Sequence, residues 1–282
     1  MPAQPRHTSA TSRDESTPAE LNLQVTSETG RLRQVIVHTP GPEMEMVSPD
    51  GLKDLLFEDI LFPGKARSEH ADMCSVFRKI VGRHDAVLQI SDLLLEAFSQ
   101  EEARTDFVDQ LCRVFVESNF QAFQEDLQTL SPEELRHFAV TGVSSLRLSS
   151  RPLPNLMFTR DVAAVVNDHV VLSHPATAAR ARESIMTDIV LRYHPALSPY
   201  RDRLIRLPQG VTFEGGDLLV VSPEIVLIGH SQRTSFGGVM TVARQLFERT
   251  PVQHVVMVNL PKKRSCMHLD TVFTFASPSE CV

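Results

Sequence analysis

Three acidic loops, each leading into an apolar strand-forming run, constrain this chain more than any other feature. They are 154–161 before 162–166, 213–217 before 218–221, and 267–271 before 272–275. Their wide spacing predicts a repeated strand-containing unit that gathers carboxylates around one cavity. Clustered carboxylates raise one another's pKa, so we expect a cationic ligand among them. The planar guanidinium suits several carboxylates best, because its five N–H donors form a fixed fork.

Two of the loops contain further chemistry. If the strand of the third loop begins near Cys266, side chains alternate and His268 and Asp270 share one face. A histidine beside a carboxylate is a candidate acid/base pair, and a surface His and Asp on a half-exposed strand is the alternative. In the second loop, the pair Gly215 and Gly216 allows a tight turn and close approach of other groups.

Composition limits the class of protein. With 282 residues, 42% of them hydrophobic, the chain can bury a large core. The net charge of -7 with scattered basic residues argues against nucleic acid and against an anionic membrane surface. No apolar run has membrane-spanning length, and no secretory signal is recognisable. Four cysteines without CxxC spacing indicate a reducing compartment, so we expect a cytoplasmic protein.

The sequence divides into segments that differ in composition and in the spacing of apolar residues. Residues 1–20 are rich in Pro, Ser, Thr and charge and predict a disordered tail. Apolar spacing predicts a helix over 68–84 and several helices over 91–138, with Ser131 capping one of them. After residue 151, strands, a hairpin at Asn167-Asp168, a helix over 176–193 and further strands follow. This order predicts an α/β fold with mixed sheets covered by helices.

Seven short strings carry a family resemblance: Ser27–Arg31, Leu56–Ile60, Glu69–His70, Phe158–Asp161, Glu214–Asp217, Ser231–Thr234 and Met267–Phe273. At these residues the sequence resembles the arginine deiminases of the guanidine-modifying (pentein) superfamily. The resemblance implies an α/β-propeller of five ββαβ modules around a central cavity, with an all-helical insertion after the first module. Residues 21–282 would then be the pentein domain, and about 91–138 the insertion.

The resemblance implies hydrolysis of L-arginine to L-citrulline and ammonia through a covalent Cys-thiouronium intermediate. Asp161 and Asp270 would grip the guanidinium through charge-assisted hydrogen bonds. Glu214 would orient and charge His268. His268 would protonate the departing ammonia and then deprotonate the attacking water.

The resemblance also implies four residues around the rest of the substrate. Asn155, Arg180 and Arg233 match positions that hold its polar end, where arginine suits an α-carboxylate. Phe158 would pack on the aliphatic stem. No cofactor is implied, the expected partner is the small molecule L-arginine, and a homo-oligomer is left open.

The sequence departs from the family at the nucleophile, which is a cysteine in the last module of a longer chain. Cys74 and Cys112 lie in predicted helices, Cys281 lies beyond a turn, and Cys266 would sit beside His268 instead of opposite it. We therefore expect the final module to be missing or incomplete, and these 282 residues alone to be inactive.

Other functions stay open. A non-catalytic arginine-binding paralogue is one alternative, and a related amidinotransferase or methylarginine hydrolase is another. The helical insert and the Glu-Gly-Gly-Asp and Met-His-Leu-Asp-Thr strings favour the deiminase. A metal site built from His268, Asp270 and Glu214 lacks an accompanying motif such as HExxH, so we expect no metal.

Overall fold

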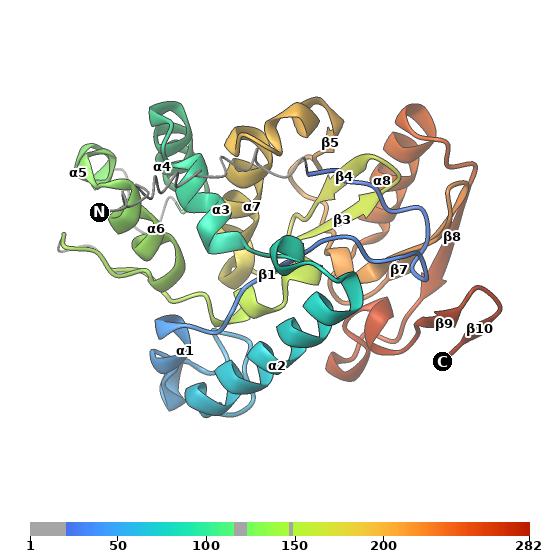
Figure 1. Cartoon of the computed structure of the whole chain (residues 1–282), viewed down its shortest axis with the longest axis horizontal. Helices are drawn as coiled ribbons and strands as arrows, with labels where there is room; N and C mark the ends of the chain where they lie inside the picture. The colour runs from blue at the N-terminus through green and yellow to red at the C-terminus, as the bar shows by residue number, and fades with distance from the viewer. Residues whose placement is uncertain (1–20, 116–122, 147–148) are drawn as a thin grey trace, which may run out of the picture.

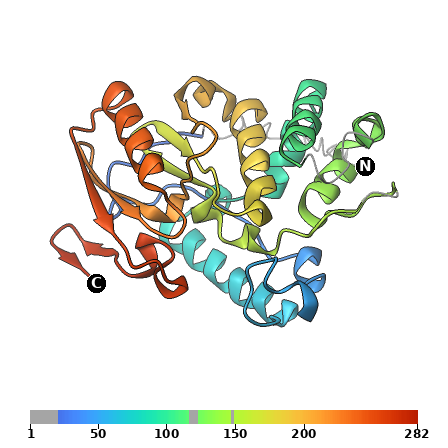
Figure 2. The same ribbon diagram turned by 180° about the vertical axis from the view of Figure 1, so that it is seen from behind.

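The computed structural model of the chain describes residues 21–115, 123–146 and 149–282 (Figure 1). The predicted tail over residues 1–20, and Phe120 of the predicted insert, lie outside these ranges. Within them, no helix combines the length and apolar character needed to cross a membrane. Helix α7 (Ala181–Tyr193) stands between a group of helices on one side and the sheets on the other (Figures 1 and 2).

The first complete unit has ββαβ order. Strands β3 (Ala163–Val166) and β4 (His169–Leu172) are antiparallel, and α7 leads to β5 (Leu204–Ile205), which is parallel to β4. Asn167 in the hairpin turn has φ of 53°, a left-handed conformation that asparagine tolerates well. The predicted hairpin is therefore confirmed.

The second unit repeats this topology. Strands β6 (Leu218–Ser222) and β7 (Ile225–His230) are antiparallel, and α8 (Phe236–Arg249) leads to β8 (His254–Asn259), parallel to β7. The Ser235 side chain caps α8 by accepting a hydrogen bond from the backbone N–H of Gly238. Two ββαβ units in succession confirm the mixed α/β character expected from the sequence.

The N-terminal part is a smaller unit. Strands β1 (Val35–Val37) and β2 (Val87–Gln89) pair in parallel, with α1 (Pro42–Glu45) and α2 (Pro63–Val81) between them. Helix α2 ends at Val81 and is capped by Gly82, whose φ of 76° is a left-handed conformation that favours glycine. The observed helix, Pro63–Val81, begins and ends earlier than the predicted range of 68–84.

In the described residues between β2 and position 146, the chain forms α3 (Ile90–Ala97), α4 (Glu101–Val114), α5 (Gln124–Thr129) and α6 (Pro132–Thr141). The predicted cap at Ser131 is present as a full capping box, in which the Ser131 hydroxyl and the Glu134 carboxylate each accept a backbone N–H. The aromatic side chains of these helices belong to the core, as their spacing predicts.

Two apolar cores meet at the sheet β3-β4-β5. One core joins α3, α4 and α6 to α7 and includes Val170 of β4. The other fills the space between the two three-stranded sheets and α8, and it includes Val166 and Val171. Because β3 and β4 are packed on both faces, the loop that precedes β3 is fixed in position.

The expectation of a strand running from Cys266 is wrong. The chain forms two 3-10 turns, η10 (Arg264–Cys266) and η11 (Leu269–Thr271), and the next strand is β9 (Phe275–Ser277), which pairs with β10 (Glu280–Cys281). The backbone N–H of Leu269 donates to the Asp217 carboxylate at 2.9 Å, and the Leu269 side chain is buried. These contacts hold a turn where local propensity predicts a strand.

Candidate functional site

Three short turns bring the acidic loops of the sequence together. Turn η9 (Gly215–Asp217) packs against both η6 (Thr159–Asp161) and η11. Turns η6 and η9 lie immediately before β3 and β6 and end on an aspartate, and η11 carries Asp270. The repeated loops therefore gather their carboxylates at one place, as the sequence predicts.

The absence of a side chain at Gly216 lets Asp161 and His268 come close to the backbone. A Cβ atom on Gly216 would lie 2.9 Å from Asp161 Oδ1 and 2.9 Å from His268 Nδ1. At Gly215, a Cβ would lie 2.4 Å from the backbone oxygen of Arg160. Side chains larger than hydrogen do not fit at either position, which confirms that the glycine pair permits close approach.

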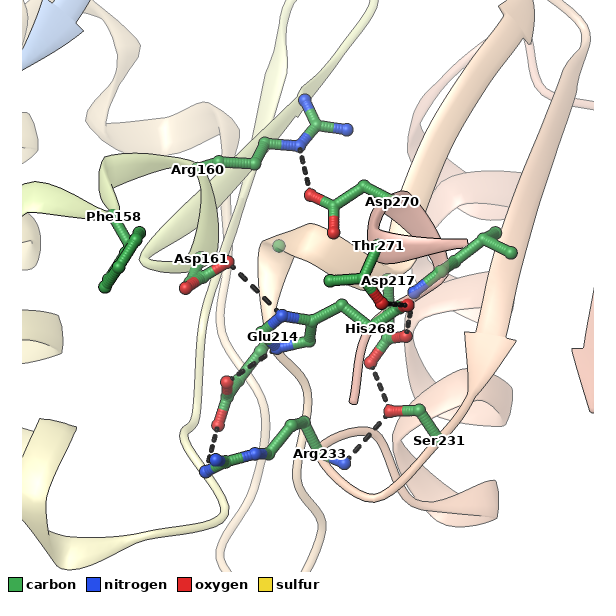
Figure 3. Close-up of polar contacts among 12 residues, drawn as sticks. Phe158, Arg160, Asp161, Glu214, Asp217, Ser231, Arg233, His268, Asp270 and Thr271 are labelled. Carbon is green, nitrogen blue, oxygen red and sulfur yellow. Dashed lines mark hydrogen bonds and ion pairs between the residues drawn. The ribbon is translucent and has the colours of Figure 1, made fainter. Parts of the chain in front are cut away.

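His268 lies between two carboxylates (Figure 3). Its Nε2 is 2.8 Å from Glu214 Oε2 and its Nδ1 is 3.5 Å from Asp161 Oδ1. Burial alone would lower the pKa of His268, but the hydrogen bond to Glu214 and the charges of the surrounding carboxylates outweigh burial and raise it. The imidazole is therefore stabilised in its protonated form.

Glu214 is buried and held by several groups. The backbone N–H of Ala176 donates to its Oε1 at 3.2 Å, and Arg233 Nη1 lies 3.9 Å from the same oxygen. Burial favours the neutral acid, but the bond to His268 and the charges of Arg233 and Arg180 outweigh it and lower the pKa of Glu214. The ionised form of Glu214 and the protonated form of His268 therefore stabilise each other.

Asp217 belongs to the site but was not among the predicted site residues. It is fully buried, and it accepts hydrogen bonds from the Ser231 hydroxyl at 2.6 Å and from the Leu269 N–H. Burial raises its pKa. Asp217 fixes the backbone next to His268. The sequence feature that could have identified it is its position in the Glu-Gly-Gly-Asp string, where it ends a turn as Asp161 does.

Arg180 is buried beside Asp161. Its Nη1 donates to Asp161 Oδ2, its Nε donates to Glu183 at 2.8 Å, and its Nη2 donates to the backbone oxygens of Asn155 and Phe158 at 3.1 Å each. The two carboxylates hold the pKa of Arg180 above its ordinary value, although burial opposes them. Arg180 ends turn η7 (178–180) ahead of α7, so the predicted helix start at 176 is wrong and Arg180 is not on a solvated face.

The other predicted substrate-binding residues differ in exposure and in whether their side chains already form hydrogen bonds. The Asn155 side-chain amide donates to the backbone oxygen of Leu55 at 2.7 Å, whereas Phe158 is 48% exposed. Arg233 is buried, and its Nη1 has no hydrogen-bond partner within the described residues. Arg233 therefore offers a buried donor, whereas the donors of Asn155 and Arg180 already bind the protein.

Asp270 is the least enclosed acidic residue of the group. Its Oδ2 lies 4.0 Å from Arg160 Nε (Figure 3). Burial and the nearby charge of Asp161 raise the pKa of Asp270 to about 6, and His268 and Arg160 oppose this rise. Near neutral pH its protonation is therefore sensitive to small changes in its surroundings.

The four cysteines lie in different places. Cys74 in α2 and Cys112 in α4 are buried, and burial raises the pKa of both thiols. Cys281 is exposed in β10. Cys266 ends η10, with its Sγ 3.8 Å from the Ser265 hydroxyl, so it does not share a strand face with His268 as expected. Among the described residues, no group of three or more His, Cys, Asp or Glu side chains could hold a metal ion.

Comparison with solved structures identifies the class of fold. The chain superposes on the DDAH of Pseudomonas aeruginosa, solved as a complex with citrulline, with a TM-score of 0.52 and 14% identity over 88% of this chain and 68% of that one. An amidinotransferase of the saxitoxin pathway from Microseira wollei gives a TM-score of 0.53 and 12% identity, covering 92% and 68%. The protein therefore has the fold of the pentein class.

Within this class, the chain belongs to the arginine deiminase family. The family model described as arginine deiminase matches residues 53–151 and 117–282. The arginine deiminase of Listeria monocytogenes serovar 1/2a is 33% identical over 281 residues, covering 92% of this chain and 68% of the relative. That of Oenococcus oeni is 33% identical over 287 residues, covering 90% and 66%. The chain spans about two thirds of the length of these curated relatives.

Proposed function

We propose that this chain carries the substrate-binding and proton-transfer groups of an arginine deiminase, which hydrolyses L-arginine to L-citrulline and ammonia. The observation that carries the proposal is His268, buried between the carboxylates of Glu214 and Asp161. A histidine whose protonated form is favoured in this way, next to further carboxylates, suits a reaction that releases ammonia from a guanidinium.

The guanidinium would bind to Asp161 and Asp270. Both carboxylates adjoin His268, since its charge acts on Asp270 and its Nδ1 faces Asp161. Charge-assisted hydrogen bonds from the planar guanidinium to two carboxylates would fix its position and its plane. The bound cation would also relieve the repulsion between these carboxylates.

His268 would act first as an acid and then as a base. Its raised pKa favours the protonated imidazolium, which can give a proton to the departing ammonia. The neutral imidazole would then accept a proton from the attacking water. Glu214 would keep the ring oriented throughout, because it holds Nε2 at 2.8 Å.

The polar end of the substrate would meet the buried Nη1 of Arg233. Arginine is a suitable fixed cation for an α-carboxylate. Arg180 and Asn155 would join this contact only by exchanging their present protein partners for the substrate. The half-exposed ring of Phe158 is available for the aliphatic stem.

Turnover through a thiouronium intermediate also requires a thiolate facing the guanidinium carbon. Cys74 and Cys112 are buried in helices with raised pKa, and Cys281 is exposed in a terminal hairpin. Cys266 lies in a turn before His268. We therefore expect residues 1–282 to bind arginine without converting it.

Titration calorimetry and a citrulline assay on the same preparation test this proposal. We expect saturable binding of L-arginine, loss of that binding on Asp161→Asn, and citrulline formation at background level. Failure to bind arginine would refute the proposed site. Citrulline formed by the chain and abolished by Cys266→Ser would show that Cys266 is the nucleophile after all.

A further inference from the structure

Arg160 and Asp161 are neighbours on η6 but serve different sides of the site. Asp161 faces His268 and Arg180, whereas the Arg160 side chain extends over Asp270 (Figure 3). The Arg160 Nε lies 4.0 Å from Asp270 Oδ2, and Figure 3 shows the second carboxylate oxygen turned away from Arg160. The Arg160 cation therefore lies beside one oxygen of the Asp270 carboxylate, Oδ2.

The guanidinium of Arg160 is fixed by contacts other than Asp270. Its Nη2 donates to the backbone oxygen of Leu218 and to Glu28 Oε1, the latter at 3.4 Å. Glu28 is itself fixed, because its Oε1 accepts the backbone N–H of Val220 at 2.9 Å and its own N–H donates to the Val220 oxygen at 2.8 Å. Turn 27–30 and β6 therefore hold Arg160 in place.

This fixation distinguishes Arg160 from an ordinary surface ion pair. Exposed pairs contribute little, partly because two mobile side chains must be ordered. Arg160 is 39% exposed and Asp270 is 27% exposed, but the ordering of Arg160 is supplied by Glu28 and β6. Its charge is therefore held near Asp270 whether or not a ligand is present.

The surroundings of Asp270 explain why one cation there matters. The charged groups that act on it are His268 and Arg160, which favour its ionised form, and Asp161 and Asp217, which oppose it. His268 is shared with Glu214 and Asp161, so Arg160 is the cation whose position is independent of the catalytic histidine. Without Arg160, burial and the charges of Asp161 and Asp217 would favour neutral Asp270, and His268 alone would oppose them among these groups.

We propose that Arg160 is a positioning residue: fixed by Glu28 and by the Leu218 carbonyl, it orients the Asp270 carboxylate and keeps it negative for the substrate guanidinium. The inference rests on the proposed function for the identity of that cation. Glu28 and Val220 are 192 positions apart in the sequence, and their hydrogen bond fixes Arg160. The proposed function thereby gains a role for turn 27–30, which acts through Arg160 on one of the two carboxylates that bind the guanidinium.

Carbon-13 NMR titration of the aspartate carboxyl groups tests this directly, with the Asp270 resonance assigned by its loss in Asp270→Asn. In the wild-type chain we expect a midpoint near 6. In Arg160→Gln the midpoint should rise by about 0.5 to 1 pH unit, the Coulomb effect of one charge at this distance in a solvated setting. Glu28→Gln should give a smaller rise, because Arg160 loses one of its anchors.

The matched control is Arg151→Gln, which removes an exposed arginine paired with Asp54 and should leave the Asp270 midpoint unchanged. A second variant, Arg160→Lys, keeps the charge and removes the forked geometry. It should leave the midpoint near that of the wild type while weakening L-arginine binding at pH 7 roughly threefold to tenfold. Both readouts are taken on variants whose melting temperatures match the wild type.

An unchanged Asp270 midpoint in Arg160→Gln, or a change equal to that of Arg151→Gln, would overturn the inference. Wild-type affinity for arginine in Arg160→Lys would show that Arg160 does not orient Asp270 and acts on it only through its positive charge. If the wild-type chain binds no arginine, the proposed function fails, whereas the NMR titration still decides whether Arg160 keeps Asp270 ionised.

Discussion

Asp161 and Asp270 differ in how the protein prepares them, although the sequence predicts the same role for both. Asp161 is 14% exposed, its Oδ2 accepts a hydrogen bond from buried Arg180, and its Oδ1 faces His268 across the space left by Gly216. Asp270 is 27% exposed and has one fixed cation 4.0 Å away. Asp161 therefore has a charged partner at each of its two oxygens, whereas Asp270 has one ion pair, at Oδ2.

The difference indicates how a cationic ligand would be recognised. The charge of Asp161 is already balanced by Arg180, so this side of the site supplies a fixed geometry before the ligand arrives. Burial and the charge of Asp161 raise the pKa of Asp270, and His268 and Arg160 offset this rise only in part. A bound guanidinium would supply the missing positive charge there, so we expect pH dependence to arise on the Asp270 side.

Asp161→Asn should have the largest effect. The change removes a charge that contacts Arg180 and His268 and, in the proposed site, the substrate guanidinium, so we expect L-arginine affinity to fall by at least about a hundredfold. Arg180 keeps Glu183, which should limit the loss of folding free energy to about 1–3 kcal/mol. Calorimetry and thermal unfolding measure both quantities, with exposed Asp54→Asn as the control. Near-normal affinity would show that Asp161 does not bind the guanidinium.

Gly216→Ala tests whether the close packing around Asp161 is needed. The added methyl group would lie 2.9 Å from both Asp161 and His268, so it must displace one of them. We expect arginine affinity to fall by about tenfold or more, because misplacing a contact by a fraction of an ångström impairs binding and orientation. Gly64→Ala in α2 is the control, since its Cβ meets only the Phe62 ring at 3.5 Å. Equal affinities of the two variants would contradict the tight geometry.

Asp270→Asn should have a moderate effect on binding and the opposite effect on stability. A carboxyl whose pKa is raised to about 6 stabilises the fold when protonated, and this stabilisation is lost as pH rises through 6. The neutral variant should therefore be more stable than the wild type above pH 6, by about 1–2 kcal/mol, and equal to it near pH 4. Denaturant unfolding at several pH values measures this difference.

The same variant should bind arginine about tenfold more weakly at pH 7.5 and lose the wild-type decline in affinity below pH 6. A variant that is destabilised at every pH would instead make Asp270 a structural residue. An unchanged pH profile of binding would place the titrating group elsewhere.

Cys266→Ser should have the smallest effect. Its sulfur contacts Ser265 in a partly exposed turn, so we expect arginine affinity to change less than about twofold, within the usual range for such a surface substitution. Calorimetry on this variant beside Asp270→Asn checks the expectation. A loss of binding as large as that of Asp270→Asn would bring Cys266 into the site.

The convergence of the acidic loops could be predicted from the sequence, because each loop combines local features that act independently of the rest of the fold. An acidic residue directly precedes an apolar run at 158–166 and at 213–221, and the second loop also contains the pair Gly215 and Gly216. The strand runs after the first two acidic loops and the Asn167 hairpin also follow local rules and were confirmed, whereas the run 272–275 was not. These features were sufficient for the ββαβ units and the carboxylate cluster.

The contacts within the cluster could not be predicted, because they depend on residues far apart in the chain. The N–H of Leu269 bonds to Asp217, 52 positions away, and this contact replaces the predicted strand by a turn. Arg180 likewise looks like one of several arginines on a solvated helix until its bond to Asp161 is seen. Helical spacing predicts one apolar face of Met73, Val76, Phe77 and Ile80. In α2, Phe77 packs against buried residues, whereas the other three are exposed.

Comparative binding of L-arginine and L-citrulline tests the guanidinium site most directly. The two ligands share the same α-amino acid end and stem, but only arginine carries a cation for Asp161 and Asp270. Calorimetry on the wild-type chain at pH 7.5 should give at least about tenfold tighter binding of arginine, since a charge-assisted hydrogen bond contributes roughly 1.5–3 kcal/mol. That preference should shrink at pH 5.5, below the pKa of about 6 of Asp270. Equal affinity for the two ligands, or a preference that does not change with pH, would contradict the assignment.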